Sequence, residues 1–184
     1  MTKTDLRREM RARLKTLGDA RAEKSRAIVA ALAAHPAFLA AKTVALFAPI
    51  PTEPDVEPLW ENAARQFCFP RVNGAQIEFV VVRHPEDLAP AAWNPLVREP
   101  AAAQPVIASA GLDLILVPGL AFTRDGRRLG RGGGYYDRLL AARDPRTVAL
   151  GVCFDLQLVA DLPCEPHDQR VDAVVTESGP LARN

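Results

Sequence analysis

The 184-residue sequence lacks the features that mark several protein classes. Its three cysteines have no close pairing and no metal-type spacing, so they indicate neither a disulfide framework nor a zinc site. No apolar run approaches the roughly 20 residues needed to cross a bilayer, and the N-terminus begins with charged residues instead of an apolar signal core. We therefore expect a cytoplasmic protein with no membrane partner.

The sequence also lacks an excess of charge of either sign. The 23 basic and 22 acidic residues give a net charge of +1, so the overall balance predicts no nucleic-acid partner. Four of the basic residues are lysines and the rest are arginines, whose planar forks suit carboxylate and phosphate groups. Hydrophobic residues make up 48% of the chain, which is typical of a globular protein. The length predicts a single domain over residues 1–184, and we expect a monomer.

Two helices are predicted at the N-terminus. Apolar residues recur at helical spacing from Leu6 to Leu17 between arginines, and Gly18 is expected to close this amphipathic helix. Asp19 is expected to cap a second helix, which should end before Pro36 because proline disfavours a helical predecessor.

Beyond Pro36 the pattern changes to short apolar runs that are typical of strands. The six predicted strands are 43–47, 67–70, 77–82, 112–117, 147–152 and 171–175. Helices expected at 56–65 and 136–142 alternate with them, and Asn73-Gly74 predicts a hairpin. The predicted fold is therefore α/β, a single layered domain with a mixed, mostly parallel central sheet flanked by helices.

A proline- and alanine-rich segment, 85–104, interrupts this alternation. We expect a long surface excursion there, because connecting segments run over the surface of a domain. Trp93 is its expected anchor on the core.

A glycine-rich loop follows the predicted strand 112–117. That strand ends at Pro118-Gly119, and open α/β sheets commonly place ligands at the carboxyl ends of their strands. Glycines at positions 130, 132, 133 and 134 allow positive φ and close approach of the backbone, whose N–H groups can form an anion-binding nest. Arginines at 127, 128 and 131 add cationic forks. The spacing matches neither a P-loop nor G-x-G-x-x-G.

The longer string around these glycines is more specific. PGLAF at 118–122 followed by RLGRGGGYYDRLL at 128–140 resembles the signature of the 5-formyltetrahydrofolate cyclo-ligase family. Four further matches occur in the same order as in that family: Lys-x-x-Leu-Arg at 3–7, Phe-Ala-Pro at 47–49 with Glu53 after it, Phe-Pro-Arg at 69–71, and His-Asp at 167–168. The resemblance extends over nearly the whole chain and is weakest across 85–104.

The resemblance implies an ATP- and Mg²⁺-dependent conversion of 5-formyltetrahydrofolate to 5,10-methenyltetrahydrofolate, with release of ADP and phosphate. In the implied mechanism the formyl oxygen attacks the γ-phosphoryl group, N10 attacks the activated carbon, and phosphate leaves as the ring closes. Phosphoryl transfer asks a protein mainly for alignment and charge neutralisation. Arginines, backbone amides and Mg²⁺ meet that need without a covalent nucleophile.

The resemblance also implies which residues form the site. ATP would be bound by Lys3, Thr4, Asp5, Leu6, Arg7, Arg128, Leu129, Gly130, Arg131, Gly132, Gly133, Gly134, Tyr135 and Tyr136. Folate would contact Ala48, Glu53, Arg131, Gly132, Gly133, Gly134 and Tyr135. Arg131 and Tyr135 are the candidate catalytic residues, and Asp137 and Asp168 the candidate Mg²⁺ ligands. Gly133 replaces a lysine that some relatives carry, which leaves Arg131 or Lys3 to serve the phosphates.

Structural roles remain open for several of these residues. Lys3 and Arg7 fit a solvated helix face, since charge runs on amphipathic helices usually meet water. Asp137 fits a carboxylate that interacts with a helix dipole, and Asp168 one that caps a turn. Among the aromatic residues, Phe47, Phe122 and Trp93 are candidates for contact with the folate ring system or, alternatively, for the core.

Two functions other than this enzyme activity are also compatible with parts of the sequence. A noncatalytic folate- or nucleotide-binding protein would share the fold and motifs, because a fold does not guarantee turnover. An RNA-binding module would use the basic stripe of Arg7, Arg8, Arg11 and Arg13. The near-neutral total charge and the lack of an aromatic stacking platform disfavour that module.

Overall fold

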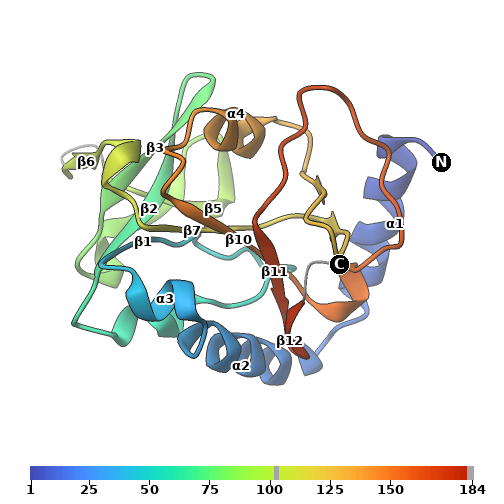
Figure 1. Cartoon of the computed structure of the whole chain (residues 1–184), viewed down its shortest axis with the longest axis horizontal. Coiled ribbons are helices and arrows are strands. Elements are labelled where there is room, and N and C mark those ends of the chain that lie inside the picture. Colours follow the sequence, from blue (N-terminus) through green and yellow to red (C-terminus); the bar gives the residue numbers. More distant parts are fainter. Residues whose placement is uncertain (102–103, 182–184) are drawn as a thin grey trace.

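Eight strands form one central sheet in the computed structural model, which describes residues 1–101 and 104–181 (Figure 1). Across the sheet they are β12 (Gly179–Leu181), β11 (Ala173–Thr176), β10 (Val148–Val152), β7 (Leu114–Val117), β1 (Thr43–Ala45), β2 (Gln66–Asn73), β3 (Gln76–Val81) and β6 (Val106–Ile107). The strands from β11 to β2 pair in parallel, while β12, β3 and β6 pair antiparallel. The predicted mixed, mostly parallel sheet is confirmed, and so is the hairpin at Asn73-Gly74.

Helices cover both faces of this sheet. Leu114 and Leu116 of β7 pack in one core with α2 (Ala20–Ala33), whereas Ile115 and Val117 pack in a second core with Leu140 of α4 (Tyr135–Ala141). Figure 1 shows α2 and α4 on opposite sides of the strands. Because side chains alternate along a strand, burial of both faces makes the whole run apolar, and this explains why the central strands were recognisable.

The two predicted N-terminal helices are present. Helix α1 (Lys3–Lys15) begins at a capping box made by Thr2 and Asp5. Asp19 occupies the N-cap position of α2, but its side chain makes no capping hydrogen bond, so its predicted role is wrong. Helix α2 ends before Pro36 as predicted, and Pro36 then begins a short third helix, α3 (Pro36–Ala40). None of the helices described is long and apolar enough to cross a bilayer.

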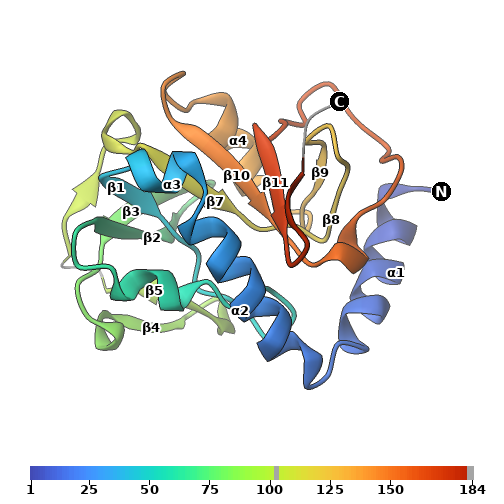
Figure 2. The same cartoon turned by 60° about the horizontal axis from the view of Figure 1, so that its bottom comes forward.

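Short 3₁₀ turns and two small ribbons complete the fold. The helix predicted at 56–65 is only the 3₁₀ turn η1 (Glu57–Glu61), because Asn62 already turns the chain by accepting the N–H of Arg65. The other 3₁₀ turns are η2 (Pro85–Asp87), η3 (Ser109–Gly111) and η4 (Asp155–Gln157). A ribbon of β8 (Ala121–Phe122) and β9 (Arg128–Leu129) lies beside α1 (Figure 2).

Within the excursion predicted at 85–104 the chain forms a hairpin of β4 (Leu88–Ala91) and β5 (Asn94–Pro100), and positions 102 and 103 lie outside the described residues. Trp93 sits at the turn between these strands and is 56% exposed. The prediction that Trp93 anchors the segment on the core is therefore wrong, because the indole stays largely exposed at the hairpin turn and belongs to neither hydrophobic core.

Candidate active site

The site lies where β1 and β7 send their loops in opposite directions. From β1 the chain continues to β2 on one side, whereas β7 pairs with the other side of β1 and leads towards β10. Such a switch point leaves a crevice beyond the carboxyl ends of the two strands. Residues from both loops, including Ala48, Glu53, Pro118 and Gly119, line one cavity there.

This cavity has a volume of about 630 Å³, within the range of small-molecule sites. Its walls come from α1, the loops after β1 and β7, the glycine loop, the β4–β5 hairpin and the 165–168 segment. The predicted site residues that line it are Lys3, Arg7, Ala48, Glu53, Arg128, Leu129, Gly130, Arg131, Gly132, Gly133, Gly134, Tyr135, Tyr136, Asp137 and Asp168. Segments that are far apart in sequence are thus brought together.

Three predicted ATP-binding residues do not line the cavity. Leu6 is buried in the core, Asp5 belongs to the capping box of α1, and Thr4 is exposed elsewhere on the helix. The helical repeat turns only positions 3, 7 and 11 towards the cavity, because residues three or four apart share a helix face. The structure therefore brings Lys3 and Arg7 to the cavity but not Thr4, Asp5 and Leu6.

The glycine loop connects β9 to α4 along the cavity. Gly132 and Gly134 have φ values of +117° and +66°, so the predicted positive φ is confirmed at these two but not at Gly130 and Gly133. A Cβ atom at Gly133 would lie 2.8 Å from the ring of Tyr135, and one at Gly130 would lie 2.7 Å from Nη1 of Arg128. Side chains at these positions would require Tyr135 or Arg128 to shift, so the glycines let the loop pass close to both.

Each of three acidic residues in the cavity is paired with a cation. Nη2 of Arg131 lies 2.9 Å from Oε1 of Glu53, whose side chain is only 8% exposed. Nη2 of Arg128 lies 2.9 Å from Oδ1 of Asp137. The guanidinium of Arg128 is itself buried, and among the described residues its Nε has no hydrogen-bond partner. A buried donor of this kind is costly unless a ligand or water satisfies it.

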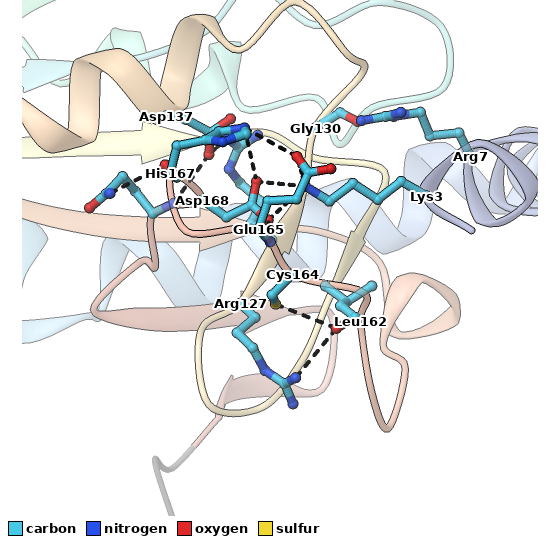
Figure 3. A network of polar contacts seen from close by, with 12 residues as sticks. Lys3, Arg7, Arg127, Gly130, Asp137, Leu162, Cys164, Glu165, His167 and Asp168 are labelled. Carbon is cyan, nitrogen blue, oxygen red and sulfur yellow. Dashed lines mark hydrogen bonds and ion pairs between the residues drawn. The ribbon is translucent and has the colours of Figure 1, made fainter. Parts of the chain in front are cut away.

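The third pair, Lys3 with Asp168, is part of a larger network (Figure 3). Nζ of Lys3 donates to both carboxylate oxygens of Asp168, at 2.8 and 2.7 Å, and to Glu165 at 2.9 Å. Burial alone lowers the pKa of Lys3, but the hydrogen bonds and charges of Asp168 and Glu165 raise it overall. Burial raises the pKa of Asp168, but hydrogen bonds from Lys3 and from the N–H of Glu165 lower it overall. Both groups are therefore charged at neutral pH.

The segment 165–168 also gathers ligands suited to a cation. One ligand atom each from Glu165, His167 and Asp168 lies within 4.8 Å of the others. Of these three residues, only Asp168 was predicted from the sequence as a metal ligand. The close spacing of these three residues in the sequence could have indicated a metal site, but exposed acidic groups often cluster without a metal.

The aromatic candidates separate into two groups. Phe47 and Trp93 line the cavity, whereas Phe122 is fully buried and packs against Gly119 and Gly151 in the core. Phe122 is therefore excluded as a ligand contact. Arg11 and the hairpin residues beside Trp93, among them Leu96, also line the cavity but were not predicted as site residues from the sequence.

The chain is similar to known proteins over almost its whole length. The profile of the 5-formyltetrahydrofolate cyclo-ligase family matches residues 1–177. The 5-formyltetrahydrofolate cyclo-ligase of Mus musculus is 29% identical over 98% of this chain and 96% of its own. The enzyme of the same name from Escherichia coli K12 is 32% identical over 78% of this chain and 82% of its own.

A solved structure supports the same assignment. The 5,10-methenyltetrahydrofolate synthetase of Aquifex aeolicus matches with a TM-score of 0.87 and 32% identity, over 100% of this chain and 94% of that one. The similarity covers the central sheet together with the loops that build the cavity. The chain belongs to the 5-formyltetrahydrofolate cyclo-ligase family.

Proposed function

We propose that this protein converts 5-formyltetrahydrofolate to 5,10-methenyltetrahydrofolate, with consumption of ATP in the presence of Mg²⁺. The observation that carries this proposal is the convergence of three charge pairs and a glycine-rich loop in one cavity. Phosphoryl transfer requires such an arrangement, because the protein must align two substrates and neutralise phosphate charge.

The fit to ATP rests on the loop and on α1. Glycines at 130, 132 and 133 leave backbone amides accessible, and Lys3 and Arg7 line the same cavity from the helix side. Nε of Arg7 donates to the carbonyl of Gly130 at 3.0 Å, which leaves its terminal nitrogens available to phosphate oxygens. The Nε of Arg128, which has no hydrogen-bond partner in the described part of the chain, is a further donor. We accordingly assign the triphosphate to Lys3, Arg7 and the loop.

The fit to Mg²⁺ rests on Asp137 and Asp168. Oδ1 of Asp137 accepts from Arg128 and from the N–H of Gln169, while no hydrogen bond from the described residues reaches its Oδ2. Asp168 is ionised but fully engaged by Lys3 and the N–H of Glu165. Mg²⁺ usually takes one or two protein carboxylates and keeps its other sites for water and phosphate. Asp137 has a free oxygen for this role, whereas Asp168 would have to release Lys3.

The folate side of the cavity combines one buried carboxylate with apolar walls. Oε2 of Glu53 accepts the N–H of Ile50, and its Oε1 pairs with Arg131. We assign the pterin nitrogens to Glu53 as hydrogen-bond donors, and the ring faces to Phe47 and Trp93. Ala48 extends the same wall.

Arg131 and Tyr135 connect the two halves of the cavity. ATP, when bound, supplies the phosphoryl group that activates the formyl oxygen. The guanidinium of Arg131 is held by Glu53 on the folate side and belongs to the loop assigned to phosphate, so it is placed to balance charge between the two substrates. Tyr135 borders the cavity, where its hydroxyl can orient the folate.

The remaining expectations are part of this proposal. A monomer is part of it, and one domain over residues 1–184 is supported by the continuous sheet. A cytoplasmic location is supported by three free cysteines. The noncatalytic alternative predicts the same binding without turnover.

The decisive test is the absorbance of the methenyl product with purified protein and 5-formyltetrahydrofolate, measured with and without ATP and Mg²⁺. We expect product only when both are present. If folded protein yields no product but 5-formyltetrahydrofolate or ATP raises its melting temperature, the noncatalytic binder replaces the enzyme.

Replacement of the metal ligands should change the dependence on Mg²⁺. We expect Asp137→Asn to raise the Mg²⁺ concentration for half-maximal activity by at least about tenfold, the effect that loss of even an outer-shell partner of a metal can have. Asp168→Asn should do the same if Lys3 gives way to the ion. Asp161→Asn is the matched control, because Asp161 pairs with Arg127 outside the cavity. An unchanged Mg²⁺ titration in Asp137→Asn would remove that residue from the site.

A further inference from the structure

The tip of the β4–β5 hairpin presents an exposed tryptophan to the cavity. Trp93 and Leu96 are 56% and 62% exposed, and both line the cavity. The hairpin forms a two-stranded sheet of its own, separate from the central sheet. The orientation of the Trp93 ring must therefore be set by contacts that hold the hairpin against the rest of the domain.

One carboxylate makes the contact that reaches the ring. The indole Nε1 of Trp93 donates to Oε1 of Glu99 at 3.2 Å. The same oxygen accepts the backbone N–H of Val72 at 3.0 Å, and Val72 belongs to β2 and lines the cavity. Glu99 thus joins the ring, its own strand β5 and the central sheet through a single atom.

The other attachments of the hairpin do not touch Trp93. Arg98 forms an ion pair with Glu57 of η1. Nη1 of Arg71 donates to the carbonyl of Ala101 at 2.7 Å, just beyond the end of β5. These contacts hold the strand in place, but among the described residues only Glu99 accepts a hydrogen bond from the indole.

The chemistry of the pair explains why an acceptor is needed. The indole N–H can only donate a hydrogen bond, so a hydrogen bond that fixes the angle of the ring must be made to an acceptor. A carboxylate is a stronger acceptor than a neutral group, and the second donor, from Val72, fixes the position of the carboxylate itself. The ring is thereby oriented before any ligand arrives.

We propose that Glu99 is a positioning residue for the folate substrate, which acts by holding the Trp93 indole as a wall of the cavity. This inference rests on the proposed function and adds to it a residue outside the motifs that identify the family. The ring stands with Val72, Ile77 and other apolar lining, whereas the cationic lining of the cavity comes largely from α1 and the glycine loop. A flat aromatic wall suits the rings of a folate, and the triphosphate belongs with the cations.

The test uses variants of the full chain in a Trp60→Phe background. The chain has two tryptophans, so this background leaves Trp93 as the only indole emitter. Glu99→Ala removes the acceptor, while Glu99→Gln keeps a carbonyl oxygen at the same place. Glu78→Ala is the matched control, because it breaks a part-buried ion pair with Arg71 on the neighbouring strand and leaves the hydrogen bond between Trp93 and Glu99 in place.

For Glu99→Ala we expect the KM for 5-formyltetrahydrofolate to rise about five- to tenfold, the factor that one lost hydrogen bond represents. Both kcat and the KM for ATP should stay at the parent values. The Trp93 emission should shift to longer wavelength because the freed ring moves into water. Glu99→Gln and Glu78→Ala should behave like the parent in both measurements.

Three results would overturn the proposal. Parent values of KM and emission in Glu99→Ala would show that the bond does not position the ring. If Glu99→Gln raised the KM for 5-formyltetrahydrofolate as much as Glu99→Ala, the effect would be due to the charge of Glu99. If the KM values for both substrates rose in parallel, the effect would be due to a general disturbance of the structure. A parent protein that forms no product would instead refute the proposed function, and the emission data would still decide whether Glu99 holds the ring.

Discussion

Replacement of Arg131 by alanine is expected to lower kcat/KM by about 100- to 1000-fold, the range found when one preorganised donor to developing charge is removed. Arg131 contributes two nitrogens to Glu53, at 3.1 and 2.9 Å, and its side chain is 38% exposed, so it faces both the protein and the open cavity. Glu53 is the carboxylate assigned to folate. Among the described residues, Arg131 carries the only guanidinium that links Glu53 to the glycine loop, and alanine removes it. Steady-state kinetics with each substrate varied in turn measure the effect.

Matched variants separate catalysis from folding in this experiment. Arg146→Ala removes another arginine from an ion pair, but that side chain is 83% exposed and lies outside the cavity, so activity should be retained. Arg131→Lys keeps the charge but loses the planar fork and should recover only part of the activity. Circular dichroism should show folded Arg131→Ala protein. A kcat/KM near that of the wild type in this variant would exclude Arg131 from the mechanism.

Much of the fold could be predicted because burial on both faces leaves a strong sequence signal. The strands β7 and β10 were recognisable as continuous apolar runs, and the Asn73-Gly74 turn fixed the antiparallel pairing of β2 with β3. The hairpin of β4 and β5 gave no such signal. It forms a separate two-stranded sheet, and its exposed Trp93 was wrongly predicted to anchor on the core, because a large aromatic side chain is usually buried.

The site could be predicted only as far as sequence motifs reach. The glycine loop and the two aspartates carry local patterns, and all of them line the cavity. Thr4, Asp5 and Leu6 show the limit, because a motif written along the chain says nothing about which side of a helix each residue occupies. The ion pairs of the site could not be predicted either, because partners such as Lys3 and Asp168 are far apart in the sequence and come together only in the tertiary fold.

Gly126→Ala is expected to have the largest effect on stability, a loss of about 3 kcal/mol or more in the free energy of unfolding. Gly126 has a φ of +86°, and a Cβ atom there would lie 2.3 Å from the backbone carbonyl oxygen of Val171. Backbone cannot move aside as a flexible side chain can. The carbonyl of Gly126 also accepts the N–H of Val171 at 2.9 Å, so relief of the clash would break this bond. Urea denaturation followed by circular dichroism measures the loss.

Two further glycine variants distinguish the clash from the backbone angle. Gly74 has a similar φ of +60° but nothing within 4 Å of the added Cβ, so Gly74→Ala should cost only about 1 kcal/mol. Gly126→Asn tolerates the left-handed region better than alanine yet still carries a Cβ, and it should be as unstable as Gly126→Ala. Rescue by asparagine would show that the angle, not the contact with Val171, decides. Gly126 lies two residues before Arg128, the first residue of β9. A displaced turn would therefore also move the buried guanidinium of Arg128, which pairs with Asp137. We expect activity and stability to fall together.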